Sequence, residues 1–142
     1  MQHEIQASLK KFVESTLGVD CVWIYDGATL PSTRPIATIE ALPNVVSTQS
    51  KGNETMERVY RFQIGVICAN STQKARLPEQ LSDAINFGRI PLYDTTVSPA
   101  PIVGSFNAIV TQETPMPAGS VDETQKHKTY LDVSVTRLYG KN

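Results

Sequence analysis

The chain has 142 residues, of which 40% are hydrophobic and 19% are charged. A chain of this length buries roughly two thirds of the surface that it exposes when unfolded, so we expect a single domain over residues 1–142. Thirteen Lys and Arg residues nearly balance fourteen Asp and Glu residues. Because no basic cluster is present to neutralise phosphates, the composition argues against sequence-specific nucleic-acid binding and against binding to an anionic membrane.

The amino-terminal segment has the pattern of an amphipathic helix. Apolar residues recur at helical spacing from Ile5 to Leu17, and Gly18 supplies a stop signal. The segment that follows, residues 19–25, is rich in Val, Ile, Trp and Tyr and ends at the turn dipeptide Asp26-Gly27. This composition predicts a first strand directly after the helix.

The next part of the chain predicts a short strand, a loop and a long strand. Pro35 and Pro43 limit the second strand to residues 34–42. Residues 44–54 are mostly polar, which predicts an exposed, mobile loop. Between residues 55 and 69, apolar side chains alternate with polar ones, which predicts a long, half-buried strand. The apolar positions are Tyr60, Phe62, Ile64, Val66 and Cys68.

A second helix is expected over residues 78–87. Pro78 would break a helix that had already begun, whereas it suits the first turn of a helix, and Gly88 ends the segment. A short extended piece at residues 89–93 and a proline-rich connection at residues 94–104 follow.

The remaining segments predict two further strands. Phe106, Ala108 and Val110 alternate with polar neighbours and predict one of them, and the same alternation over residues 130–138 predicts the last. Residues 114–128 between them have hardly any apolar content and are expected to form a solvated arm.

This order of elements predicts an α+β fold with long loop arms. We expect a mainly antiparallel sheet of about four to five strands with two helices packed on one face. The predicted core combines the strand residues Phe62, Ile64, Val66, Val133 and Val135 with the helix residues Leu9, Phe12, Leu81 and Ile85.

The chain offers little for catalysis or metal binding. Its two histidines, His3 and His127, lie in polar segments that we expect to be mobile, without the partners of a catalytic triad or a zinc site. Its glycines are scattered singly and form no phosphate-binding loop. Cys21 and Cys68 lie in apolar runs, which favours two buried thiols, although the sequence leaves a disulfide open. We therefore expect no enzyme activity and no cofactor.

No run of about eighteen apolar residues occurs in the chain. We therefore expect no membrane segment, and a protein that is made in the cytosol or assembles from it.

Taken in order, these elements resemble the tail-completion or tail-terminator proteins of long-tailed bacteriophages. The resemblance covers nearly the whole chain and rests on the order of elements rather than on a signature motif. It is carried by the opening helix with Ile5, Leu9 and Phe12, by the strand at residues 34–39, by the long strand at 58–66 and by the terminal strand at 130–139.

The resemblance implies a structural virion protein. Such a protein forms a ring, most often a hexamer, at the head-proximal end of the tail tube, where it stops tube polymerisation and joins the tail to the head. The implied partners are further copies of the chain, the tail tube protein below, and a head-completion or connector protein above. Phage DNA would pass through the ring, and the protein would reside in the neck of the virion after assembly in the host cytoplasm.

The two polar segments supply the candidate assembly contacts. We expect the arm at residues 114–128 to be mobile in the free subunit and to become ordered on a neighbouring protein, with Met116 as an apolar anchor within a charged rim. The candidate interface residues are Asn44, Val45, Val46, Pro115, Met116, Pro117, Asp122, Glu123, Lys126 and Lys128.

Two alternatives stay open at the level of sequence. Another phage neck component or minor capsid component would share this small α+β build and differ in the ring that it contacts. A small ligand-binding or enzymatic α+β domain would instead use a pocket lined by Trp23, Tyr25 and Tyr93.

Overall fold

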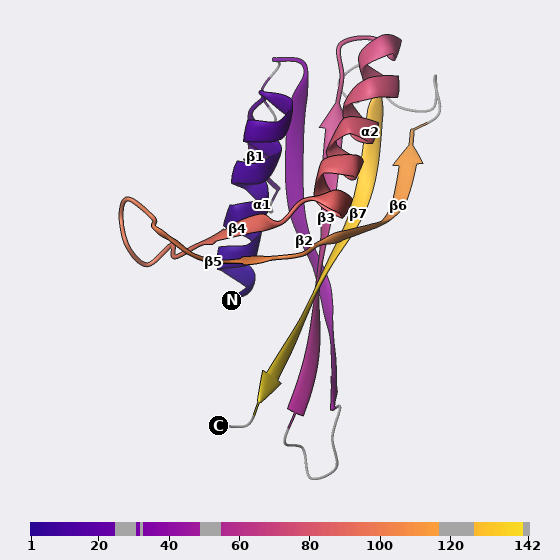
Figure 1. Cartoon of the computed structure of the whole chain (residues 1–142). Helices are drawn as coiled ribbons and strands as arrows, with labels where there is room; N and C mark the ends of the chain where they lie inside the picture. The colour runs from indigo at the N-terminus through magenta and orange to yellow at the C-terminus, as the bar shows by residue number, and fades with distance from the viewer. Residues whose placement is uncertain (25–30, 32, 49–54, 117–126, 141–142) are drawn as a thin grey trace.

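The structure, a computed structural model, describes residues 1–24, 31, 33–48, 55–116 and 127–140. Two helices and seven strands make up this described part (Figure 1). In chain order they are α1 (Gln2–Leu17), β1 (Cys21–Trp23), β2 (Ile36–Thr48), β3 (Thr55–Ile67), α2 (Ser71–Phe87), β4 (Ile90–Tyr93), β5 (Ile102–Phe106), β6 (Ile109–Pro115) and β7 (Lys128–Gly140).

Five of the strands form the main sheet in the order β1-β2-β3-β7-β6, and β4 and β5 form a separate two-stranded sheet. All pairs in the main sheet are antiparallel except β1 and β2. Figure 1 shows α1 and α2 side by side on one face of the main sheet. The α+β class and the mainly antiparallel sheet that the sequence predicts are therefore confirmed.

One hydrophobic core lies between the helices and this face of the sheet. Alternate residues of β3 are buried in it, and their antiparallel partners on β7 are buried with them, because residues directly opposite one another share a face. The predicted core is confirmed, with Phe12 partly buried at its margin and the other predicted residues buried within it: Leu9, Phe62, Ile64, Val66, Leu81, Ile85, Val133 and Val135.

The predicted start of the second helix is wrong. Helix α2 begins at Ser71 and contains Pro78 in its interior. The side chain of Asn70 caps this helix, because its carbonyl oxygen accepts the N–H of Gln73 at 2.9 Å. Pro78 removes one helical hydrogen bond, at a cost of about 3 kcal/mol. Burial of Pro78 itself, with Leu81 one turn later, offsets that cost.

The predicted boundary between the second strand and the loop is also wrong. Strand β2 continues through Pro43 to Thr48 and pairs with β3 along its length. A bulge between Leu42 and Val45 leaves Pro43 and Asn44 outside the ladder, so the missing N–H of the proline costs no strand pairing. Of the predicted loop, residues 49–54 lie outside the described residues.

The strand predicted around Phe106, Ala108 and Val110 is two strands in two different sheets. Phe106 ends β5, which pairs with β4, whereas Val110 belongs to β6, which pairs with β7. Phe106 and Ala108 are both buried, as the alternation predicts. The alternation does not show that the chain passes from one sheet to the other after Phe106. The first predicted strand is also shorter than expected, because β1 has three residues.

Replacing Phe62 with Ala should lower the free energy of unfolding by about 3 to 5 kcal/mol, because the fully buried ring leaves a cavity in a close-packed core. The matched control is Phe87→Ala, since the Phe87 side chain is 88% exposed. We expect the control to change the value by less than about 1 kcal/mol in the isolated subunit. Urea unfolding measures both, and similar losses would contradict this placement of the core.

The opposite face of the sheet is crowded at Gly65. A Cβ atom at this position would lie 2.5 Å from Thr38 Oγ1 and 3.1 Å from Lys128 Cε. The Lys128 amine lies 4.3 Å from the centre of the Tyr130 ring, and Thr38 and Lys128 are both buried. The absence of a side chain at Gly65 is therefore what lets these neighbours lie over the central strand.

Gly65→Ala should therefore destabilise the protein by about 1 to 3 kcal/mol through overpacking. Gly104→Ala is the control, because nothing lies within 4 Å of a Cβ at that strand position. Adding Thr38→Ala to Gly65→Ala should recover part of the loss if the clash with the hydroxyl causes it. Thermal melts of the four proteins measure this, and equal effects at the two glycines would contradict the crowding.

Candidate assembly surface

Three strands of the main sheet project beyond the helices. We call this projection the tongue, and define it as residues 45–48 of β2, 55–59 of β3 and 136–140 of β7. These residues continue the ladders of the main sheet, with Val46 opposite Arg58 and Arg58 opposite Arg137. Figure 1 shows the tongue leaving the body of the molecule on the side away from both helices.

Apolar side chains of the tongue are exposed. Val45 is 52% exposed and Val46 is 51% exposed, and because they are consecutive strand residues they lie on opposite faces. The predicted interface residues Val45 and Val46 are thus accessible, but they belong to a strand and not to the mobile loop that the sequence predicts. The extended backbone of β2 holds both of them in place.

Like charges lie directly opposite each other on one face of the tongue. Arg58 of β3 and Arg137 of β7 are cross-strand partners, an arrangement that destabilises a sheet when nothing compensates it. Among the described residues the ion pairs are Met1 with Glu4 and Lys10 with Glu14, so no described carboxylate pairs with these arginines. The Nε atom of Arg58 is also buried without a hydrogen-bond partner.

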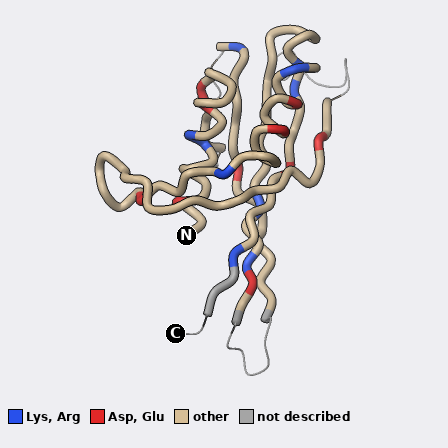
Figure 2. The backbone as a smooth tube through the Cα atoms, in the orientation of Figure 1, with Lys and Arg blue, Asp and Glu red and all other residues tan. Residues whose placement is uncertain are grey.

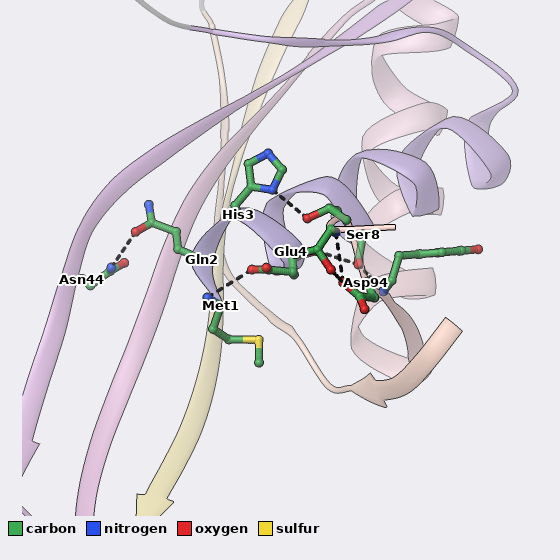
Figure 3. Close-up of polar contacts among 10 residues, drawn as sticks. Met1, Gln2, His3, Glu4, Ser8, Asn44 and Asp94 are labelled. Atoms are coloured by element: carbon green, nitrogen blue, oxygen red, sulfur yellow. Dashed lines mark hydrogen bonds and ion pairs between the residues drawn. The ribbon is translucent and has the colours of Figure 1, made fainter. Parts of the chain in front are cut away.

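The base of the tongue is attached to the start of α1 (Figure 3). Asn44 Nδ2 donates to Gln2 Oε1 at 3.0 Å, across the bulge in β2. The side-chain oxygen of Asn44, Oδ1, is buried without a hydrogen-bond partner. Asn44, a predicted interface residue, lies within strand β2 and not in a loop, and it connects the base of the tongue to the first helix.

The same end of α1 also holds the β4–β5 hairpin. Ser8 Oγ donates to the carbonyl oxygen of Glu4 at 2.7 Å and accepts the N–H of Tyr93 at 3.0 Å. The amino terminus lies 3.1 Å from Glu4 Oε2. Hydrogen bonding to the backbone N–H of Glu4 and to this ammonium group lowers the pKa of Glu4. The network therefore fixes the first turn of α1 against two strands.

His3 has a structural place in this network. Its ring stacks on that of Trp23, with the two centres 5.6 Å apart, and His3 Nδ1 lies 3.0 Å from Thr95 Oγ1. The prediction that His3 lies in a mobile polar segment is wrong, because helix α1 begins at Gln2.

The predicted arm at residues 114–128 is partly built into the sheet. Thr114 and Pro115 belong to β6, and the N–H of Met116 donates to the Lys128 carbonyl at 2.8 Å. Lys74 Nζ donates to the Met116 carbonyl at 2.6 Å. These contacts correct the expectation of a mobile arm at both of its ends. Four candidate residues lie outside the described residues: Pro117, Asp122, Glu123 and Lys126.

Lys128 also differs from the expectation of an exposed charge at an interface rim. Its side chain is only 6% exposed. It packs over Gly65 and against the Tyr130 ring, a cation–π contact that keeps the ammonium group over the sheet.

Exposed apolar residues that the sequence analysis did not single out lie at the end of α2 and on the strands after it. Phe87 is 88% exposed and Ile109 is 61% exposed, and Asn86 Oδ1 accepts the N–H of Val110 at 2.8 Å, which brings these neighbours together. Ile102 and Val103 of β5 are 61% and 60% exposed. Only the fold shows that these apolar residues are exposed.

A groove of about 390 Å³ lies between α2 and β6. Three carboxylates line it: Glu79 and Asp83 on α2 and Glu113 on β6. All three are exposed and make no ion pair with described residues. Lys74 is the basic residue of the lining, and its amine is already bonded to Met116. Negative charge therefore predominates in the groove.

The pocket expected for a small ligand lies only partly within the described residues. Tyr93 lines a groove of about 520 Å³ with Phe12 and Arg89, and Trp23 is not part of its lining. Tyr25 lies outside the described residues. Among the residues that the structure describes, no group of three or more His, Cys, Asp or Glu side chains is placed to hold a metal ion. No helix in that part of the chain is long and apolar enough to cross a membrane.

No family model matches the chain, and no curated protein matches it significantly.

Both cysteines are free and buried, as the sequence favours. Burial raises the pKa of the Cys21 thiol to about 12 and that of the Cys68 thiol to about 11, from a usual value near 9.0. The neutral thiol is therefore the favoured form at every pH below about 11.

Alkylation of native protein by iodoacetamide at pH 8 should be slow at both cysteines. A pKa of about 11 in place of 9.0 leaves about a hundredth of the usual thiolate at Cys68, and the thiolate is the reacting form. In urea both cysteines should react at the rate of a free thiol. Mass spectrometry of the labelled peptides measures the two rates, and native labelling as fast as in urea would contradict the burial.

Proposed function

We propose that this chain is a structural subunit of a long-tailed bacteriophage that assembles with copies of itself into a ring. The ring, most often a hexamer in proteins of this kind, would sit at the head-proximal end of the tail tube, end tube polymerisation and join the tail to the head. The tail tube protein would lie below it and a head-completion or connector protein above it. Phage DNA would pass through its centre, and its location would be the neck of the virion.

The tongue is the observation that carries this proposal. Its three paired strands project past the helices, and it exposes Val45 and Val46 on its two faces. A β element of this kind gains little from its own domain, because neither face is packed against a helix. Exposed apolar residues on a projecting sheet indicate a surface that another protein covers. The order of elements, which resembles the tail-terminator proteins, supplies the kind of assembly.

Purified protein should form a closed oligomer at micromolar concentration, seen as a discrete mass in native mass spectrometry and as rings in negative-stain images. Val45→Asp with Val46→Asp should weaken this assembly, because two charges would enter the covered surface. Val97→Asp is the control, since Val97 is 50% exposed but lies in the β4–β5 loop. Equal assembly by the tongue variant and the control would contradict the role of the tongue.

The position in the tail is tested with the tail tube protein of the same phage. The oligomer added to polymerising tubes should bind one end and shorten the mean tube length measured by electron microscopy. Binding to a connector ring without any effect on tubes would favour another neck component, which is the alternative within the same class. Binding to neither partner would contradict a role in head-to-tail joining.

A further inference from the structure

We propose that the tongue of one copy docks into the α2–β6 groove of the next copy, with Arg58 and Arg137 facing Glu79, Asp83 and Glu113. This inference rests on the proposed self-assembly and names the two surfaces that meet.

The tongue has a positive face that pairs with no carboxylate among the residues that the structure describes. Arg58 and Arg137 are directly opposite each other, and Arg58 Nε is buried without a hydrogen-bond partner. Glu57, the nearest acid in the sequence, alternates to the other face of β3 and cannot lie between them. A guanidinium group binds a carboxylate through two parallel hydrogen bonds, so carboxylates from another molecule would relieve the repulsion between the two arginines.

The groove offers the complementary chemistry. Glu79 and Asp83 are four residues apart on α2 and therefore project from one side of the helix, and Glu113 approaches them from β6. Exposed Ala75 and Pro115 supply apolar surface in the same lining. Val46, which is 51% exposed and in register with Arg58, is the apolar residue of the tongue that would lie against them.

The positions of the two surfaces require two molecules. Figure 2 shows the basic residues of the tongue at one end of the molecule and the acidic residues of α2 and β6 towards the other. One chain cannot bring them together. A two-fold contact between tongues would place four arginines together, whereas a tongue-to-groove contact joins unlike surfaces. Repetition of such a head-to-tail contact gives a ring when the rotation closes.

Charge exchange between the surfaces tests the contact. The tongue variant carries Arg58→Glu and Arg137→Glu, and the groove variant carries Glu79→Lys and Asp83→Lys. Each alone should lose at least a hundredfold in apparent affinity of self-association, measured by mass photometry. Mixed together they should assemble again with alternating subunits, because each tongue then meets a groove of opposite charge. The chain with all four changes should assemble alone.

Two further variants distinguish a loss of assembly from a folding defect. Arg137→Glu alone creates an opposite-charge cross-strand pair with Arg58, so it should raise the melting temperature of the isolated subunit slightly while it weakens assembly. Arg76→Glu changes the charge of an exposed α2 residue outside the groove lining and should leave assembly unchanged.

The outcomes separate the docking mode from the proposed function. If the wild-type protein forms rings and the tongue variant or the groove variant forms them equally well, the docking mode is overturned and the proposed ring stands. Failure of the folded variants to assemble when mixed would overturn it too. A wild-type protein that stays monomeric would overturn both the docking mode and the proposed ring.

Discussion

The pairing of β3 with a neighbour on each side is the constraint on which the rest of the structure depends. Strand β3 pairs with β7 over Thr55–Ile67 and with β2 from Met56 to Ile67, apart from the bulge in β2. Its alternating face fixes the register, because a slip of one residue would turn Phe62 and Ile64 away from the helices. The positions of β7 that match these residues are apolar for the same reason. Both helices then pack on the one apolar face of the sheet.

A difference in length between helices and strands accounts for the tongue. Helix α1 has 16 residues and rises about 24 Å at about 1.5 Å per residue. Strand β3 has 13 residues and spans about 43 Å at about 3.3 Å per residue. Helices of this length can cover little more than half of the central strands. The uncovered remainder is a sheet with two exposed faces, and Asn44 anchors its base to α1.

The spacing of apolar residues in the sequence predicts the core, because burial of one face sets that spacing. Phe62 recurs at the two-residue period of its strand, and Leu9 and Ile85 recur at the helical period. The same reasoning gave wrong element boundaries at two prolines. Pro43 and Pro78 are strong local signals of a break, but a bulge removes Pro43 from the ladder and burial retains Pro78 in its helix. Both compensations depend on residues distant in the sequence. The sequence also does not show that the chain passes from one sheet to another after Phe106. Alternation of apolar residues predicts which side chains are buried, but it does not predict which strand is the partner.

The candidate surface was harder to predict than the fold. Polar composition directed attention to loops, whereas the paired arginines lie on strands and become neighbours only through the register of β3 with β7. A net charge of -1 likewise does not show that the tongue carries paired arginines while carboxylates predominate in the α2–β6 groove. That difference between two distant surfaces gives the subunit a direction, which a head-to-tail contact needs. Because the tongue continues the ladder of the core, most of its backbone is ordered before it meets a partner. In the proposed contact little conformational entropy would then be lost on docking, so modest charge pairing would suffice to hold neighbouring copies together.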